Sequence, residues 1–307
     1  MKLEGIHHIT AITGDAPQNV RFYSDTLGLR LVKKSVNQDD PTVYHLFYAD
    51  EEGGAGSDIT FFEYPKASRG RAGAGMVHRI TWRVGSTRAL DFWAARLEER
   101  GVTTERDGDR LRFDDPEGLG LELAVVDTTD EPLSARHPAI PQDFALQGFD
   151  GVRVYTAAAA ASKDFLGSTM NFDPTSDSSW IARGEKRGGF YIYDEAPDRP
   201  GLSGAGTVHH IAWATPIDEH TAWHERIGAA GADVTPIIDR YYFKSIYFRE
   251  PSGVLFEIAT LGPGFAVDEP IESLGERLAL PPDYEHLRDK LADVLTPLPD
   301  PRAESQS

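Results

Sequence analysis

Cysteine is absent from this chain of 307 residues. Disulfides, iron–sulfur clusters and thiolate-bound metals are therefore excluded, so any metal ion must be held by His, Asp, Glu or water. Long apolar runs are also missing. No stretch approaches the ~20 apolar residues that cross a bilayer, and the first residues, MKLEGIHH, form no apolar signal segment. We therefore expect a cytoplasmic protein that does not contact membranes.

Basic residues are scarce relative to acidic ones. The chain has 31 Lys and Arg against 49 Asp and Glu, which gives a formal net charge of −18. Such a surface repels a phosphate backbone, so nucleic-acid binding is not expected. Hydrophobic residues make up 40% of the chain, which is enough for a substantial core. The length itself suggests about two domains.

One phrase occurs twice, far apart in the chain. IHHITAIT (6–13) and VHHIAWAT (208–215) both place a double histidine on a strand-like segment. After the second copy come a helical stretch, IDEHTAWHERIGAAG, and three strand-like segments, ADVTPII, KSIYFREP and GVLFEIAT. Because internal repeats define whole architectures, the order strand, helix, strand, strand, strand predicts a repeating βαβββ module.

The same order of elements occurs in the other parts of the chain. In the first module a helix is expected from Asp15, its N-cap, to Leu27, and Gly28 ends it. In the second, Ser86 caps a helix that ends before Gly101. The third module, with GVRVYT, AAAASKDFLG and GGFYIYDE, is the least regular. The four expected modules span residues 5–65, 76–126, 147–196 and 207–262.

The sequence therefore predicts an α+β fold of four βαβββ modules paired into two domains. Each domain is expected to be a curved mixed sheet flanked by helices. Consecutive modules are paired, which gives an N-terminal domain at 1–130 and a C-terminal domain at 147–262. A tail at 263–307 follows, and its segment PDYEHLRDKLADVL predicts one closing helix. The Gly-Pro-rich start of this tail suggests a lid over the mouth of a site.

Three stretches carry a resemblance to a known family. They are HHITAITGDAPQNVRFYSDTLGLRLVKKSVNQDDPTVYHLFYAD, RYYFKSIYFREPSGVLFEIAT and LGPGFAVDEP. They resemble ring-cleaving dioxygenases of the hydroquinone 1,2-dioxygenase type, within the vicinal oxygen chelate superfamily of glyoxalase-type enzymes and extradiol dioxygenases. The resemblance covers nearly the whole chain. It implies an enzyme that opens hydroquinone-like rings, or catechols as the alternative, with O2.

The double histidines and one glutamate are the candidate metal ligands. His7–His8 and His209–His210 stand on the first strands of two modules, and Glu257 stands on a last strand. Neighbours on a strand point to opposite faces, so one histidine of each pair faces a common site. A carboxylate in the apolar run GVLFEIAT needs a partner. The resemblance implies the ligand set His8, His210 and Glu257, which suits Fe(II), with Mn(II) as the alternative.

The resemblance also implies roles for five further residues. His209, Tyr247 and Arg240 would be catalytic. His209 or Tyr247 would take the phenolic proton, and Arg240 would stabilise negative charge. His7 and Thr10 would contact the substrate. Taken without the resemblance, Thr10 is an ordinary strand residue, and Arg240 and Tyr247 are ordinary surface or core residues. The expected partners are a small aromatic diol and O2, and the chain is expected to allow a homo-oligomer.

The two middle modules offer a comparison. Arg79 and Gly151 stand where His210 stands in the fourth module, and Glu122 stands at the position of Glu257. Since a guanidinium does not ligate a cation, we expect one metal site in the chain, and a buried Arg79–Glu122 ion pair in place of a second. Three aromatic residues could build the pocket, although core positions suit them better: Phe243, Trp180 and Tyr191.

Two other functions fit parts of the pattern. A glyoxalase-type isomerase or lyase would need a fourth ligand from the first module, with Glu63 as the candidate and Ni(II) or Zn(II) as the metal. In the second and fourth modules the carboxylate falls four residues after a turn glycine. The same count from Gly56 reaches Thr60, so the fourth position is expected to be open. A metal-free binding protein is the other alternative, but it would have little use for the histidine pairs.

Overall fold

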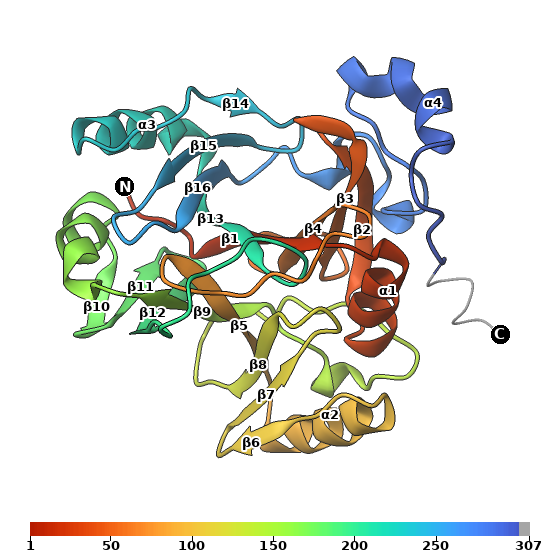
Figure 1. Cartoon of the computed structure of the whole chain (residues 1–307), viewed down its shortest axis with the longest axis horizontal. Coiled ribbons are helices and arrows are strands. Elements are labelled where there is room, and N and C mark those ends of the chain that lie inside the picture. Colours follow the sequence, from red (N-terminus) through yellow and green to blue (C-terminus); the bar gives the residue numbers. More distant parts are fainter. Residues whose placement is uncertain (301–307) are drawn as a thin grey trace.

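Two mixed eight-stranded sheets form the body of the protein (Figure 1). The computed structural model describes residues 1–300, so the last part of the predicted tail, 301–307, lies outside the described residues. Each sheet contains two modules of the order predicted from the sequence. The α+β fold built from four βαβββ modules is therefore confirmed.

The first module follows the local sequence signals closely. The Asp15 side chain accepts a hydrogen bond from the backbone N–H of Gln18 (2.9 Å), and Gly28 ends the helical segment with a positive φ of 72°. The second half of that segment is a π-helical turn rather than an α-helix. The elements are β1 (Ile6–Thr13), α1 (Ala16–Val20), the π-helical turn (Arg21–Thr26), β2 (Arg30–Asn37), β3 (Asp40–Ala49) and β4 (Asp58–Glu63).

The fourth module is built in the same order. Its second strand is short, because only two residues of the region around the predicted strand ADVTPII pair with a neighbour. Pro236, within this region, has no N–H to donate to a ladder hydrogen bond. The elements are β13 (Val208–Thr215), a 3-10 turn (Ile217–Glu219), α3 (His220–Ala229), β14 (Ile238–Asp239), β15 (Lys244–Arg249) and β16 (Leu255–Thr260).

The two middle modules differ in their helices. In the second module Ser86 accepts a hydrogen bond from the Ala89 N–H (3.2 Å) and begins a full helix, as predicted. In the third, the predicted helix is only a 3-10 turn (Ala159–Ser162) and a π-helical turn (Phe165–Thr169). The elements are β5 (Met76–Val84), α2 (Thr87–Glu99), β6 (Glu105–Asp107), β7 (Arg110–Asp114), β8 (Gly120–Val125), β9 (Phe149–Thr156), β10 (Asp173–Ser176), β11 (Ser179–Arg183) and β12 (Gly188–Glu195).

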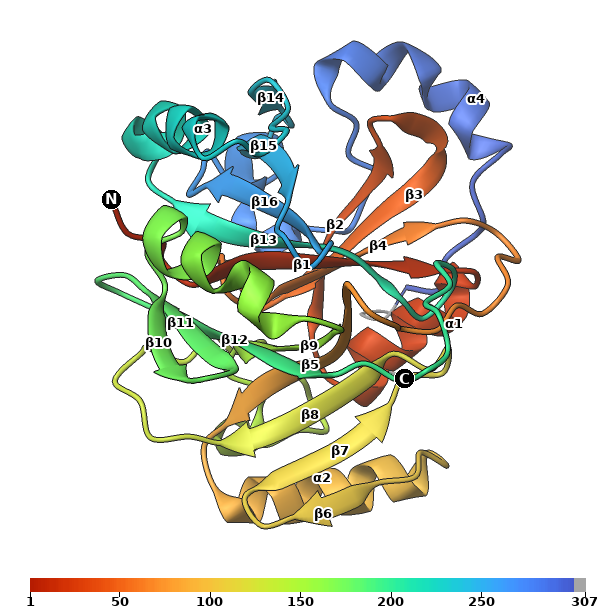
Figure 2. The ribbon, with the colours of Figure 1, turned by 60° about the vertical axis from the view of Figure 1, so that its left-hand side comes forward.

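The pairing of modules differs from the prediction. One sheet has the order β14-β15-β16-β13-β1-β4-β3-β2 and the other the order β10-β11-β12-β9-β5-β8-β7-β6. The first module thus shares a sheet with the fourth, and the second module shares a sheet with the third. Figure 2 shows the central strands of the first of these sheets, β1 and β13, side by side. Pairing of consecutive modules into 1–130 and 147–262 was wrong. The modules pair through their first strands, β1 with β13 and β5 with β9. Because every module has such a strand, local sequence patterns do not specify which two modules pair.

The hydrophobic core lies between the two sheets. Ile9 and Ala11 of β1 belong to one buried cluster together with Ile80 and Trp82 of β5. Because side chains alternate along a strand, His8 and Thr10 of β1 lie on the opposite face of the first sheet. Each fully buried aliphatic or aromatic side chain stabilises this arrangement by about 1.5–3 kcal/mol. The core therefore fixes which face of β1 and β13 is open for a site.

The C-terminal tail runs along the edge of the first sheet. Leu278 forms an isolated bridge with Lys34 on the edge strand β2, so this edge is covered rather than open. The predicted helix at 282–295 is split into a 3-10 turn (Pro282–Leu287) and α4 (Arg288–Ala292). Two shorter turns precede it, at Phe265–Val267 and Ile271–Ser273.

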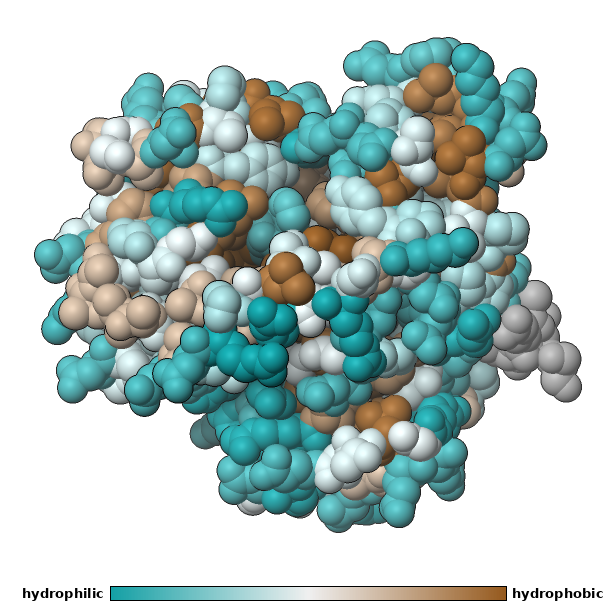
Figure 3. All heavy atoms as spheres, viewed as in Figure 1, coloured by the Kyte–Doolittle hydropathy of each residue, from teal (hydrophilic) through white to brown (hydrophobic). Residues whose placement is uncertain are grey.

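The surface on the face shown in Figure 3 is mainly hydrophilic, and its hydrophobic side chains form small separate groups. This agrees with the large excess of acidic residues. Within residues 1–300, no helix is long and apolar enough to cross a membrane.

Candidate metal centre

The double histidines lie at β-bulges. Along β1, Ile6 pairs with Trp213 and His8 with Ala212, so His7 is an extra residue in the ladder. The same irregularity in β13 leaves His209 as the extra residue before His210. A bulge re-aims the side chain that it carries. It explains how two consecutive histidines, which would point to opposite faces of a regular strand, come into contact.

A chain of hydrogen bonds orients the ring of His8. The Nε2 of His7 lies 3.2 Å from the carbonyl oxygen of Thr260, to which only an N–H can donate. Burial and the neighbouring His8 lower the pKa of His7 to about 3, so the ring is neutral and its Nδ1 carries no proton. Nδ1 of His7 therefore accepts from Nδ1 of His8 at 2.9 Å. The Nε2 lone pair of neutral His8 is left for another partner.

The second pair repeats this arrangement. Nδ1 of His209 lies 2.8 Å from Nδ1 of His210, and the Nε2 of His210 points to the same place as that of His8. The two Nε2 atoms are 3.3 Å apart. In both pairs a hydrogen bond to the first histidine thus orients the ring of the second.

Glu257 completes a cluster of three donor atoms. Its Oε2 lies 3.2 Å from Nε2 of His8 and 2.9 Å from Nε2 of His210, and these three residues are at most 4% exposed. The hydroxyl of Ser245 donates to the other carboxylate oxygen, Oε1. Three buried electron-pair donors that converge on one point, within 4.8 Å of one another, need a cation between them. The donor set fits a divalent metal.

The electrostatics of the cluster are those of a site made for positive charge. Burial raises the pKa of Glu257, but the two imidazoles outweigh burial and hold the pKa well below its usual range. Burial likewise lowers the pKa of His8, but the charge of Glu257 and a hydrogen bond to it outweigh burial, so the net pKa is raised. A proton on His8 and a metal ion therefore compete for the same place.

Two threonines and a histidine form the wall beside His8. The hydroxyls of Thr10 and Thr60 are 2.8 Å apart, and Nε2 of His45 lies 2.9 Å from the Thr60 hydroxyl. His45 was not predicted. The repeat contains a signal for it, because His45 holds the same place relative to Thr60 as Ser245 holds relative to Glu257.

Thr60 occupies the position of a fourth protein ligand. Thr10 pairs with Thr60 on β4 just as Ala212 pairs with Glu257 on β16. Glu63 lies three residues further along β4, so its side chain starts on the opposite face. Its Oε1 accepts hydrogen bonds from the Ala16 N–H (3.3 Å) and the Thr296 hydroxyl (2.9 Å). The expectation of an open fourth position agrees with this register.

Tyr247 and Arg240 lie on the fourth-module side of the pocket. Tyr247 is directly opposite Glu257 in the ladder, and its ring packs against His210 with centroids 5.7 Å apart. Burial and the charge of Glu257 raise the pKa of the Tyr247 hydroxyl, so it stays protonated. The Nε of Arg240 lies 3.4 Å from this hydroxyl, and its two terminal nitrogens pair with Asp39 at 2.9 and 3.1 Å. Asp39 comes from the first module, so this pair joins the two modules at the pocket.

His209 lies at the outer side of the site. His209 is exposed to solvent, but its ring packs against that of Phe62, with the two ring centroids 5.6 Å apart. Desolvation of the ring and the neighbouring His210 lower the pKa of His209 to about 4. With the Nε2 lone pair of His210 on a metal ion, Nδ1 of His210 would carry the proton and donate to Nδ1 of His209, so the proton of the neutral His209 ring would be on Nε2 and His209 would be a donor.

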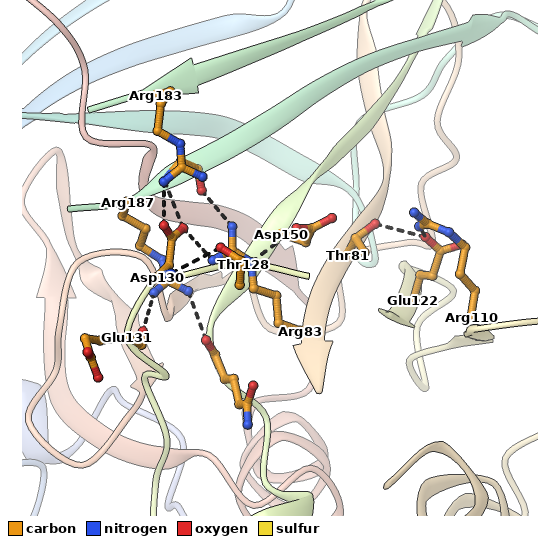
Figure 4. A network of polar contacts seen from close by, with 12 residues as sticks. Thr81, Arg83, Arg110, Glu122, Thr128, Asp130, Glu131, Asp150, Arg183 and Arg187 are labelled. Atoms are coloured by element: carbon orange, nitrogen blue, oxygen red, sulfur yellow. Dashed lines mark hydrogen bonds and ion pairs between the residues drawn. The ribbon is translucent and has the colours of Figure 1, made fainter. Parts of the chain in front are cut away.

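The second sheet has ion pairs where the first sheet has its cluster of potential metal ligands. The predicted Arg79–Glu122 ion pair was wrong. Glu122 pairs with Arg110 and accepts a hydrogen bond from Thr81 at 3.2 Å (Figure 4). It also pairs with Arg112 at 2.9 Å. Arg112 is opposite Glu122 in the ladder, as Tyr247 is opposite Glu257, so it reaches the carboxylate more directly than Arg79.

Other charges on the second sheet are also paired with one another. Arg83 bonds Asp130 at 2.7 Å and Asp150 at 3.1 Å, and Arg183 pairs with Asp130 from the other side (Figure 4). Asp150 is the bulge residue of β9, at the position that His209 holds in β13. Within residues 1–300, His8, His210 and Glu257 are the one such group of three potential metal ligands. Of the candidate pocket aromatics, Phe243 lies at the site, whereas Trp180 and Tyr191 are buried core residues of the second sheet.

A comparison with protein families identifies the superfamily. The model of the Glyoxalase/Bleomycin resistance protein/Dioxygenase superfamily matches residues 5–123 and 148–258. The chain belongs to this superfamily. Within the superfamily, its relatives confirm the predicted enzyme class, because those that align over nearly the whole chain are named ring-cleaving dioxygenases.

Three proteins are similar to this chain over nearly its whole length. It is 40% identical to a Bacillus subtilis protein named "Putative ring-cleaving dioxygenase MhqA", over 97% of this chain and 100% of the relative. It is 33% identical to the chlorohydroquinone/hydroquinone 1,2-dioxygenase of Sphingobium indicum, over 94% and 95% of the two chains. A crystal structure of a Bacillus subtilis protein named "putative dioxygenase" has a TM-score of 0.90 at 39% identity, covering 97% of this chain and 98% of that one.

The buried neutral histidines make the metal-free protein sensitive to acid. The pKa of His7 is about 3 in the folded state and about 6.5 in the unfolded chain, so the unfolded chain binds more protons below pH 6.5. Stability is therefore lost as the pH falls from about 6.5 towards 3. We expect His7 alone to lower the free energy of unfolding by about 2 kcal/mol between pH 7 and pH 5. Urea unfolding at both values would measure this, and His7→Gln should show a smaller fall.

Proposed function

We propose that this chain is a metal-dependent dioxygenase that opens the ring of hydroquinone-like diols with O2. His8, His210 and Glu257 would hold the metal, with Fe(II) as the metal favoured by two imidazoles and one carboxylate. The convergence of these three donor atoms is the observation that carries the proposal. Bound Fe(II) would supply the Lewis-acid and redox chemistry that no side chain offers. In the reaction one ring C–C bond breaks and both atoms of O2 enter the product.

The remaining pocket residues would bind the diol and stabilise negative charge. The protonated Tyr247 hydroxyl and the Arg240 guanidinium, which contact one another, would both donate to an anionic substrate oxygen. His209 would donate through Nε2. The contacts of Tyr247 and His209 support donor roles in place of the base role expected from the sequence. Thr10 is fully buried and bonded to Thr60, so it would act through Thr60 and not by contact with the substrate, whereas His7 would act by orienting His8.

Oxygen uptake tests the proposal directly. The protein would be purified without air, loaded with Fe(II) and given methylhydroquinone or, in parallel, catechol. Rapid uptake with methylhydroquinone supports a hydroquinone dioxygenase, and uptake with catechol alone moves the assignment to ortho-diols. A stoichiometric metal without uptake for either diol would overturn the proposal.

Glu63 separates this proposal from a glyoxalase-type enzyme. A four-ligand isomerase or lyase would lose its metal when Glu63 is replaced. The register of β4 and the hydrogen bonds of Glu63 to Ala16 and Thr296 place it away from the cluster. We therefore expect Glu63→Gln to bind the same amount of metal, measured by plasma emission, and to retain oxygen uptake. Loss of metal in this variant, with the fold intact by circular dichroism, would favour the isomerase.

A further inference from the structure

The pocket beside the metal ligands is too small for an aromatic ring. It is lined by His8, His210, His45 and Tyr247, among others, and its free volume is about 40 Å³. An apolar cavity that holds benzene measures ~150 Å³. A side chain of the wall must therefore move aside before a substituted diol binds.

A larger cavity lies directly behind one wall of this pocket. Its volume is about 260 Å³, and it shares Tyr242 and Phe243 with the metal-side pocket. The remaining lining is mainly apolar, with Ala55, Leu261 and Phe265, three glycines and the neutral His7. No Lys, Arg, Asp or Glu occurs among the described residues that line it. The cavity therefore suits an apolar group and not a charged one.

The two shared residues are held differently. The Tyr242 hydroxyl bonds Asp268 at 3.0 Å, and the ammonium group of Lys33 lies 5.0 Å from the ring centroid, so Tyr242 is anchored. Phe243 has only ring contacts at the site, with centroids 5.1 Å from those of both His7 and His8. It thus packs against both His8, which lines the metal-side pocket, and His7, which lines the second cavity. Of the two shared side chains, Phe243 therefore needs less free energy to move than Tyr242.

We propose that Phe243 is the specificity-determining residue of the site: its ring separates the metal-side pocket from the second cavity, and an apolar ring substituent of the diol takes the second cavity when Phe243 turns aside. This inference rests on the proposed diol substrate. It adds the substituent class, which is an uncharged alkyl or chloro group. A carboxylate on the ring is disfavoured, because the described lining of the cavity offers it no cation.

Three diols of one ring type test the inference. Oxygen uptake by the Fe(II)-loaded protein gives kcat/KM for hydroquinone, tert-butylhydroquinone and 2,5-dihydroxybenzoate. We expect Phe243→Ala, and to a smaller extent Phe243→Leu, to raise the ratio of tert-butylhydroquinone to hydroquinone by roughly 10-fold, as expected for one added or removed apolar contact. Ala55→Leu, which fills the second cavity, should lower the same ratio by a similar factor. The dihydroxybenzoate should remain the poorest of the three.

A matched control removes a phenylalanine elsewhere. Phe92 on α2 is half-buried against Phe144 of a 3-10 turn (Gln142–Phe144), outside the site, so Phe92→Ala should leave the diol ratio unchanged. An unchanged ratio in both Phe243→Ala and Ala55→Leu, with active unmodified protein, would overturn the role of Phe243. So would efficient turnover of the dihydroxybenzoate.

Binding separates this inference from the proposed function. Calorimetric titration without O2 measures the affinity of each diol independently of turnover. Binding that follows the expected order among the variants, without oxygen uptake, would support the partition and overturn the dioxygenase. Absence of binding by all three diols to the unmodified protein and to Phe243→Ala would overturn both.

Discussion

Replacement of His210 by alanine should abolish metal binding and, with it, oxygen uptake. His210 provides one of three donor atoms, and its Nε2 lies 2.9 Å from Oε2 of Glu257. Loss of a residue that only supports a metal ligand costs ~10–100-fold in affinity, so loss of a ligand itself should cost at least about 100-fold. Metal content after dialysis and the rate of oxygen uptake with methylhydroquinone would both be measured. Both should fall to the background of the protein without added iron.

The fold of the variant must be checked, because the change also leaves a buried carboxylate with one imidazole fewer. Circular dichroism and unfolding by urea give this control. His286→Ala is the matched variant, since His286 is an exposed histidine of the tail. It should keep both the metal and the activity. A folded His210→Ala that retained stoichiometric metal would show that the metal is bound elsewhere, and the proposed centre would be wrong.

Local signals in the sequence predicted the elements well, because they act over a few residues. The caps at Asp15 and Ser86 and the helix ends at Gly28 and Gly101 all act through hydrogen bonds or backbone angles of their own segment. The third module shows the limit. Its stretch AAAASKDFLG has helix-forming residues but no capping side chain, and only short turns form.

Contacts between modules were the part that local patterns could not specify. The pairing of β1 with β13 brings His8 and His210 together although they are 202 residues apart. The three predicted ligands nevertheless lie together in the structure, because repetition places equivalent residues at equivalent positions on whichever modules share a sheet. The Arg79–Glu122 pair failed for a related reason. Side-chain partners on adjacent strands depend on the register of the whole ladder, which here favours Arg112.

The burial of Lys33 could not be predicted from the sequence. In the segment LRLVKKSVN it resembles one of two solvated lysines, but its side chain is fully buried. The tail covers it: Nζ donates to the carbonyl of Phe265 at 3.1 Å and pairs with Asp268 at 2.7 Å and with Glu269. The burial of Lys33 thus depends on chain that follows it by more than two hundred residues. In its described part, up to residue 300, the tail borders the second cavity at Phe265 and does not line the metal-side pocket, so it supports the wall of the site instead of forming the expected lid.

Removal of this ammonium group should therefore destabilise the protein strongly. Lys33→Met keeps the volume of the side chain but leaves Glu269, a nearly fully buried carboxylate, with Arg277 at 3.6 Å as its one remaining ion-pair partner among residues 1–300. Breaking a buried ion pair from one side costs about 3–5 kcal/mol, and we expect a loss of that size in the free energy of unfolding, measured with urea. Lys163→Met, at an exposed lysine, should change it by less than about 0.5 kcal/mol.

The double variant Lys33→Met, Glu269→Gln identifies the cause of this loss. If the cost comes from the unpaired carboxylate, its neutralisation should restore part of the stability, because the two changes act on one interaction and are not additive. If the double variant is less stable than Lys33→Met alone, the two residues act independently, and packing of the lysine stem explains the effect. The network also anchors Tyr242 through Asp268. The Lys33 variant should therefore weaken diol binding as well, because the anchored wall of the pocket would lose its support.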